Sequence, residues 1–401
     1  MIFAVVFGAV LLVPMVMQDV NLLVFDYRDH IESVRRMDAA GSITEPHFLF
    51  HILTVAVKRI TPGINYRAAG YAVLYLFNVL LCYVVYGVMK RGVADFPGRR
   101  AAPVAVLFSA GVLVAAPVSL FFLLRGHTSL YFGYVGINVY HNPTITALKP
   151  LALLLFGYTV LFLRDDGRRP VPTVSIAAAA VLAVFSTLAK PSFAICILPA
   201  AVLVAGYLIF RNRKVNVAAL AAGVAAPAAA VLLWQYLFTY AGGDAGESAG
   251  GGILFRPFEV MRMYTPPGTL YPKFMLSILF PVTVALLYWK EAAKDVSLKL
   301  AWIAFAFGAF YTYFLEESGA RASHANFAWS GEITLFILFV FSAALLSREN
   351  AGRFAGAARG GRDARPESRL YICLATFLLH SGCGVMWYAI HLGRLGVLYD
   401  W

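Results

Sequence analysis

The stretch FDYRDHIESVRRMDAAGSITEPHFLFH, residues 25–51, concentrates ionisable side chains beside long apolar segments. It holds three arginines, three histidines and five acidic residues: Asp26, Asp29, Glu32, Asp38 and Glu45. If residues 26–40 form a helix, one face carries Asp26, Asp29, His30 and Ser33. A carboxylate on this face could act as a general base towards an acceptor hydroxyl, and a neighbouring acid or partial burial would raise its pKa. The alternative is a solvated amphipathic helix whose charges pair among themselves.

The segment GINVYHNPTITALKP, residues 136–150, predicts a turn that opens a helix. Asn142 precedes Pro143, and proline is favoured at the first helical position. Asn142 and His141 would then lie at a helix N-terminus, which attracts phosphate. Lys149 follows one to two turns later and could point at the same anion. The alternative is a plain turn with a lysine that snorkels to the membrane surface.

A single lysine separates two apolar blocks in STLAKPSFAI, residues 186–195. Lys190 is costly at this place unless it faces water, an acid or a phosphate. It is therefore either part of a site or a marker of the water interface at a tight turn.

The segment EESGARASHANFAWSGE, Glu316–Glu332, contains the most varied polar side chains. Arg321 could grip a phosphate or diphosphate, and His324 lies three residues further on. Trp329 could stack on a sugar face, although a tryptophan at this place is more often part of the aromatic belt of a membrane protein.

The segment 241–271 begins with the glycine-rich AGGDAGESAGGG and is long enough to form a lid or a binding loop. Arg256 and Arg262 are its candidate anion contacts, although snorkelling arginines would look the same. Asp26 and Asp29 are the candidate catalytic residues. The candidate substrate-binding residues are His30, His47, His141, Asn142, Lys149, Lys190, Arg256, Arg262, Arg321 and His324.

The elements that must position these residues are transmembrane helices. The chain is 60% hydrophobic and only 13% charged, with a mean hydropathy of +0.73, whereas soluble domains carry about 25% charged residues. Its apolar blocks are long enough to cross a hydrocarbon core of about 30 Å as helices. We predict a single all-α membrane domain over residues 1–401 with eleven spans, namely 2–18, 66–89, 101–123, 146–164, 171–188, 192–210, 215–240, 272–289, 299–315, 330–347 and 370–391.

Two short apolar segments need separate interpretations. Residues 2–18 lack a basic leader and a small-residue cleavage site, so we interpret them as a retained first span and not as a signal peptide. The run His47–Val57 is too short to span, and it predicts a helix that lies in the interface or against the bundle.

The distribution of Lys and Arg predicts the orientation. With the N-terminus in the cytoplasm, the basic connections 90–100, 165–170, 211–214, 290–298 and 348–369 are cytoplasmic. The same rule explains much of the formal charge of +12 without a nucleic-acid partner. The loops 19–65, 124–145, 241–271 and 316–329 then lie on the extracytoplasmic side of a bacterial-type plasma membrane. They hold six of the eight histidines, His127 among them. The Arg- and Gly-rich segment 348–369 is predicted to be a flexible linker.

Several functional classes lack their sequence signals. The four cysteines lie inside apolar blocks, so we expect no disulfide framework. The chain has no Walker sequence, no HExxH and no CxxC pair. A divalent metal is possible from the acids and histidines, although no ligand spacing argues for one. We expect no buried acid suited to ion coupling within a span. His380, within the last span, is either a functional residue or a histidine hydrogen-bonded in the core.

A first span, an outer loop with an acidic cluster, an interfacial apolar helix and then many spans together resemble the GT-C superfamily of membrane glycosyltransferases. The matching stretch is DYRDHIE, residues 26–32. The resemblance implies that Asp26 or Asp29 is the catalytic acid residue, and that the donor is a polyprenyl-phosphate-linked sugar. The following MDAAGSITEPHFLFHIL also resembles exopolysaccharide polymerases of the EpsG type. The large soluble C-terminal domain of some GT-C relatives has no counterpart here, so the acceptor site would be built from membrane loops.

The resemblance implies glycosyl transfer with inversion to a lipid- or glycan-linked acceptor. One of the two aspartates would take the acceptor proton. Lys149, Lys190, Arg321 or His141 would hold the departing lipid phosphate. Two other hypotheses remain: a transporter or flippase for a lipid-linked glycan, and a non-catalytic scaffold of cell-envelope glycan assembly.

Overall fold

The computed structural model of the chain describes residues 1–21, 26–93, 101–124, 133–164, 171–240, 252–351 and 368–393. His127, the beginning of the predicted loop 241–271 and most of the predicted linker 348–369 lie outside these residues.

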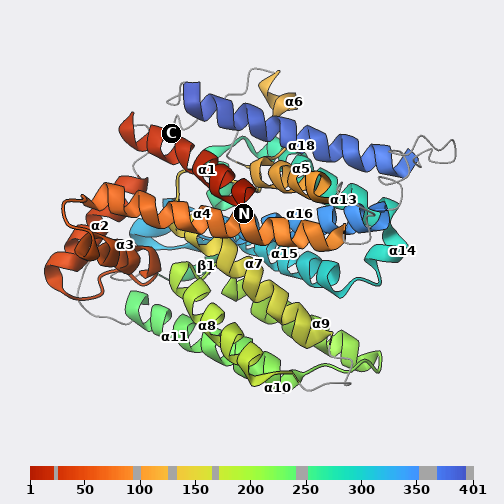
Figure 1. Cartoon of the computed structure of the whole chain (residues 1–401), viewed down its shortest axis with the longest axis horizontal. Helices are drawn as coiled ribbons and strands as arrows, with labels where there is room; N and C mark the ends of the chain where they lie inside the picture. Colours follow the sequence, from red (N-terminus) through yellow and green to blue (C-terminus); the bar gives the residue numbers. More distant parts are fainter. Residues whose placement is uncertain are drawn as a thin grey trace.

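Helices dominate the described chain, and eight helical segments are long and apolar enough to cross a membrane. The longest of them run roughly along the long axis of the molecule (Figure 1). They agree with the predicted helical bundle and, by their length and composition, with a membrane protein. The eight are α1 (Ile2–Val20), α4 (Tyr66–Gly92), α7 (Pro143–Leu163), the continuous α10 (Val217–Leu220), η1 (Ala221–Ala225) and α11 (Ala226–Tyr240), α13 (Leu270–Leu287), α15 (Val296–Phe314), α16 (Ala328–Glu349) and α18 (Ser368–Gly393).

Three other predicted spans are helical but shorter, so the count of eleven is not confirmed. They are α5 (Ala101–Val114), α8 (Thr173–Ala189) and α9 (Ala194–Phe210), with 14, 17 and 17 residues. Proline explains two of these helix ends. Ala116 precedes Pro117 and Lys190 precedes Pro191, and a residue before proline is driven out of the helical region.

The interruption after α5 is held by hydrogen bonds from distant helices. Residues 115–119 are not helical, and a short helix, α6 (Leu120–Leu123), follows them. The amide of Ala116 donates to the carbonyl of His380 at 3.1 Å, and that of Val118 donates to Leu276 at 3.0 Å. The Asn138 amide group donates to the carbonyls of Val112 and Ala115. The broken span thus keeps its backbone groups paired inside the protein.

His380 has a structural position in this arrangement. The amide of Phe280 donates to its Nε2 at 3.3 Å, so the ring proton lies on Nδ1, which donates to the carbonyl of Ala116 at 2.7 Å. The side chain is fully buried on α18. Of the two interpretations from the sequence, the hydrogen-bonded core histidine fits these contacts.

Two segments predicted as separate outer loops are joined by a small sheet, which the all-α prediction does not include. Strand β1 (Ile253–Phe255) pairs antiparallel with β2 (Leu315–Glu317), with Leu254 opposite Glu316. Between β1 and α13 lie α12 (Glu259–Tyr264) and η2 (Pro267–Thr269), and between β2 and α16 lies η3 (Gly319–His324). Segment 252–258 is therefore fixed against the end of α15.

The acidic stretch forms the helix that its sequence predicts. Helix α2 (Asp26–Ala40) packs against α3 (Leu49–Ile60), and both pack against α4 at one end of the bundle (Figure 1). Asp19 in the last turn of α1 anchors α2. Its buried carboxylate accepts from Arg28 Nε at 2.9 Å and from the Tyr71 hydroxyl, and Arg67 lies 3.8 Å away.

We predict that Asp19→Ala lowers the free energy of unfolding by about 1–3 kcal/mol, because it removes the buried acceptor of hydrogen bonds from Arg28 and Tyr71. Reversible denaturation in mixed detergent micelles would measure the change. Glu32→Ala is the control, since Glu32 pairs with Arg35 while their side chains are 55% and 53% exposed, and such pairs contribute at most about 1 kcal/mol. Equal losses in the two variants would contradict the anchoring role of Asp19.

Candidate functional site

The start of α2 meets the start of α7, and this junction brings Asp26 to the N-cap of a buried helix. The Asn142 side-chain amide donates to Asp26 Oδ2 at 3.0 Å. His141 Nε2 lies 3.9 Å from the same oxygen. The Asp26 side chain keeps 36% of its surface accessible, whereas His141 keeps 10%. Asp26 is thus open on one side and enclosed by protein on the others.

Asn142 has a fixed orientation because both ends of its amide are used. Its Oδ1 caps α7 by accepting from the amide of Ile145 at 3.0 Å, and it also accepts from the Thr144 hydroxyl at 2.7 Å. Capping requires a side-chain oxygen at this position. The nitrogen is therefore left to face Asp26, and the same residue that starts the helix positions the carboxylate.

Lys190 reaches this junction from the break between α8 and α9. Its extended backbone ends α8, and its ammonium donates to the Thr144 hydroxyl at 3.2 Å. The ammonium also lies 4.9 Å from the centre of the Trp329 ring, a cation–π distance. Trp329 in turn lies against His141, with 5.6 Å between ring centroids. A cation and an aromatic face thus stand next to the candidate base.

Electrostatics at the junction favour a weakly acidic Asp26 and a neutral His141. Burial raises the pKa of Asp26, and Lys190, Asn142 and His324 oppose that rise. Burial lowers the pKa of His141 to about 3, with a further contribution from Lys190. His141 is therefore uncharged at neutral pH, and it can hold a phosphate only as a hydrogen-bond donor.

Asp29 differs from Asp26 in its surroundings. It is exposed on α2, and it makes no hydrogen bond to the described residues. Partial burial and the charge of Asp26 raise its pKa, while Arg36 opposes them. Of the two candidate bases, Asp26 is the one held in a polar network.

The histidines of the first loop form a second, adjacent group. His30 Nδ1 lies 3.1 Å from His51 Nε2, and the rings of His30 and His47 are 6.2 Å apart. Burial and the neighbouring rings of His51 and His47 hold the pKa of His30 well below its usual range. No group of three His, Cys, Asp or Glu side chains among the described residues has the arrangement of a metal site.

A cavity of about 430 Å³ opens beside Lys190. Its lining includes His47, Lys190, Gln235, Tyr240, Glu317 and Asn326, together with apolar residues of α9 and α11. Gln235 closes one wall, because its side chain donates to the carbonyls of Pro46 and Thr187 at 2.9 Å each. The cavity therefore combines polar groups near Asp26 with an apolar wall between helices.

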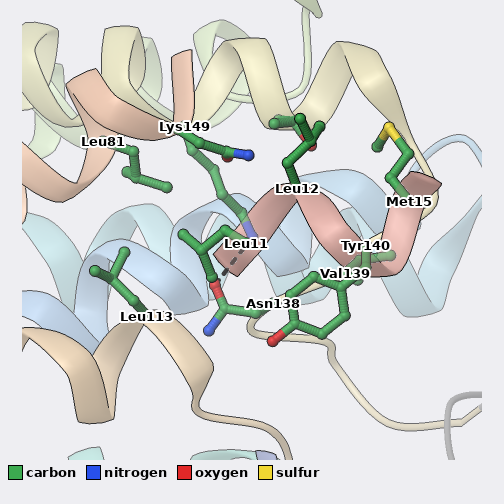
Figure 2. A pocket seen from close by; sticks show the side chains of 11 residues that line it. Leu11, Leu12, Met15, Leu81, Leu113, Asn138, Val139, Tyr140 and Lys149 are labelled. Atoms are coloured by element: carbon green, nitrogen blue, oxygen red, sulfur yellow. Dashed lines mark hydrogen bonds between the residues drawn. The ribbon is translucent and has the colours of Figure 1, made fainter. Parts of the chain in front are cut away.

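Lys149 lies deeper than the junction. It pairs with Glu332 of α16 at 3.0 Å, and the two side chains are 5% and 2% exposed. Its ammonium also donates to the carbonyl of Ile137 at 3.1 Å and to Asn138 Oδ1 at 3.3 Å. Figure 2 shows Lys149 extending from α7 towards Asn138, across a space of about 20 Å³ that is also lined by Leu11 and Leu113. Lys149 thus neutralises a buried acid instead of facing Asp26.

The remaining candidates are spread over the outer segments. Arg256 lies 3.5 Å from Glu316 across the small sheet, and Arg262 is exposed on α12. His324 is exposed at the end of η3 and is close enough to Asp26 to lower its pKa. The side chain of Arg321 lies outside the described residues.

Sequence reasoning missed Glu332 and underrated Trp329. The sequence predicted no buried acid suited to ion coupling within a span; Glu332 is a buried acid within a span, four residues inside α16 and 1% exposed, and it is paired with Lys149. In the sequence Glu332 stands at the end of a polar segment. Its spacing of three residues from Trp329 is the one signal that would have placed the two side chains on the same face of a helix. Thr144, which links Lys190 to Asn142, gave no signal beyond its place after Pro143.

Comparison of the chain with protein families, with curated proteins and with solved structures gives no match.

We predict that Asp26→Asn raises the midpoint of thermal unfolding at pH 7 by a few degrees. Because the pKa of Asp26 is raised by folding, the folded protein binds more protons, and stability falls as the pH rises from about 4 through the raised pKa. The gap between variant and wild type should therefore open as the pH rises from 4 to 8, measured by thermal unfolding in detergent.

Asp38→Asn is the matched control with the opposite sign. Hydrogen bonds from Tyr66 and Arg59 lower the pKa of Asp38, so its contribution is present at neutral pH and is lost as the pH falls below about 4. If Asp26→Asn is instead less stable than the wild type at pH 7, and this difference disappears in acid, the raised pKa of Asp26 is refuted.

We also predict that either Lys149→Met or Glu332→Leu alone costs about 3–5 kcal/mol of unfolding free energy, because each leaves one buried charge without its partner. The double variant Lys149→Met/Glu332→Leu should recover most of this loss. A double-mutant cycle by detergent denaturation measures the coupling, and purely additive losses would contradict it.

Proposed function

We propose that this protein is a membrane glycosyltransferase that moves a sugar from a polyprenyl-phosphate donor to an acceptor hydroxyl. The observation that carries the proposal is the Asp26 carboxylate, hydrogen-bonded through one oxygen to Asn142 and open on its other side, with a buried lysine and an indole ring beside it. The GT-C likeness of residues 26–32 supports the same assignment.

Asp26 is the proposed general base. Among the described residues only Oδ2 is hydrogen-bonded, by Asn142, which leaves Oδ1 for the acceptor hydroxyl. The acceptor oxygen bonds to the anomeric carbon, its proton passes to Asp26, and the bond to the phosphate breaks on the opposite face, with inversion. A raised pKa makes the carboxylate a stronger base, as this proton transfer requires.

Lys190 is the proposed contact for the phosphate of the donor head group, and Trp329 is the proposed contact for its sugar. The Lys190 ammonium would stabilise the charge that develops on the departing phosphate. The Trp329 ring lies 4.9 Å from this ammonium and would contact the sugar through the small part of its surface, 9%, that is exposed. The cavity of about 430 Å³ lined by Lys190 and Gln235 would take the first part of the lipid chain. We place this end of the bundle on the extracytoplasmic side, as the distribution of Lys and Arg in the sequence predicts.

Transport of a lipid-linked glycan is the second candidate, and the buried Lys149–Glu332 pair is the observation that favours it. Charged residues inside a membrane often line a translocation path. Lys149, however, lies six residues after Pro143 at the start of α7, a depth of only about 9 Å. A bilayer midplane lies about 15 Å from the surface, so this depth favours transfer over transport.

We predict that Asp26→Asn lowers the rate of sugar transfer by about 100-fold or more, as expected for loss of a general base. Asp29→Asn should stay close to the wild-type rate. The assay uses the purified chain in lipid nanodiscs with a panel of polyprenyl-phosphate sugars. Lys190→Met should move the acid limb of the pH–rate profile to higher pH, because Lys190 lowers the pKa of Asp26.

Wild-type rates in Asp26→Asn would overturn the assigned base. Movement of the lipid-linked glycan across proteoliposomes without turnover would favour the transporter.

A further inference from the structure

The end of the bundle opposite Asp26 holds a basic cleft. Helix α7 starts beside Asp26 and runs for 21 residues to Leu163, about 31 Å away. There the ends of α7 and α9 meet the start of α15 around a cleft of about 930 Å³. Six cationic side chains line it: Arg164, Arg211, Arg213, Lys214, Lys294 and Lys299.

Most of this charge is not neutralised by the described residues. Arg164 pairs with Asp295 at 2.9 Å, and the other five cations form no ion pair within the described ranges. Asp295 is also bound by Arg348 at 2.9 Å, and it caps α15 by accepting from the amides of Ser297 and Leu298. This acid is therefore engaged on three sides, and the described lining of the cleft carries a net positive charge.

An apolar groove continues from the cleft along the side of the bundle. It encloses about 550 Å³ and is lined by Val204, Tyr207, Ala285, Trp289, Trp302 and Ile303. Tyr207 and Lys299 line both spaces, and the Lys299 ammonium lies 4.8 Å from the centre of the Tyr207 ring. Trp289 is 62% exposed, as is usual for aromatic residues at a membrane interface.

We propose that the cleft and groove together bind one anionic phospholipid, with its phosphate among Arg211, Arg213 and Lys299 and an acyl chain against Tyr207 and Ala285. Basic pockets between transmembrane helices are suited to such head groups. A free phosphate would use only the cleft, and a nucleic acid would leave the groove empty. The proposal does not depend on the glycosyltransferase function.

Arg211→Gln/Arg213→Gln tests the cleft, since both side chains are exposed and the fold should tolerate their loss. Lys90→Gln/Arg91→Gln is the matched control. It removes the same charge from exposed positions in the last turn of α4, away from the cleft. Ala285→Phe tests the groove, because its ring would fill the space of the acyl chain.

Native mass spectrometry of the full chain, released from vesicles of phosphatidylcholine with a rising fraction of phosphatidylglycerol, counts the bound lipid. We expect one retained phosphatidylglycerol in the wild type and in the Lys90/Arg91 control. Arg211→Gln/Arg213→Gln and Ala285→Phe should each weaken retention about tenfold or more. Inorganic phosphate alone should not displace the lipid.

If lipid retention weakens equally in the Lys90/Arg91 control, the lipid is attracted by the overall positive charge and not by a specific site, and the proposal is wrong. Wild-type retention in the Arg211/Arg213 variant would do the same. Displacement by phosphate at concentrations similar to the lipid, with no effect of Ala285→Phe, would indicate a phosphate site and refute the lipid.

Discussion

In the interior of the bundle the ammonium of Lys149 faces the carboxylate of Glu332 at 3.0 Å, and both the broken end of α5 and the candidate site are linked to this pair. The pair joins α7 and α16, whose apolar stretches are 72% and 89% buried, the highest values among the eight long helices. Two charges taken out of water are tolerated only when each has its partner. Lys149 also holds Asn138, which in turn holds the broken end of α5.

The candidate site depends on this interior through one helix end. Lys149 holds α7 to α16, and the capping bonds of Asn142 at the start of α7 direct its amide nitrogen to Asp26. From the other side, Asp19 holds the first turns of α2. Asp26 is thus positioned from two independent anchors. A base that must meet its substrate within hydrogen-bonding distance requires such support.

Helix starts near the candidate site were predictable from the sequence, whereas the partners of buried side chains were not. Helix α2 begins and ends where its charge pattern predicts, because local amphipathicity decides a short surface helix. Asn142 followed by Pro143 predicted the start of α7 for the same reason. The partners of Lys149 and Lys190 were not predictable, since Glu332 and Trp329 come from another helix and only packing brings them near. The break in α5 has a local cause in Pro117, but its stabilisation depends on His380, 264 residues from Ala116.

That break sets conditions on how the chain is made. Helix α5 leaves the ribosome long before α13 and α18 are synthesised, yet the amides of Ala116 and Val118 depend on carbonyls from those later helices. The hydrocarbon core of a membrane contains no other hydrogen-bond acceptor for these two amides. A nascent chain that has reached only α11 therefore holds α5 as an unfinished element, in need of water, an insertase or a chaperone at the membrane surface. Helix α18 thus completes an early part of the protein, and quality control of this chain can act at that closing step.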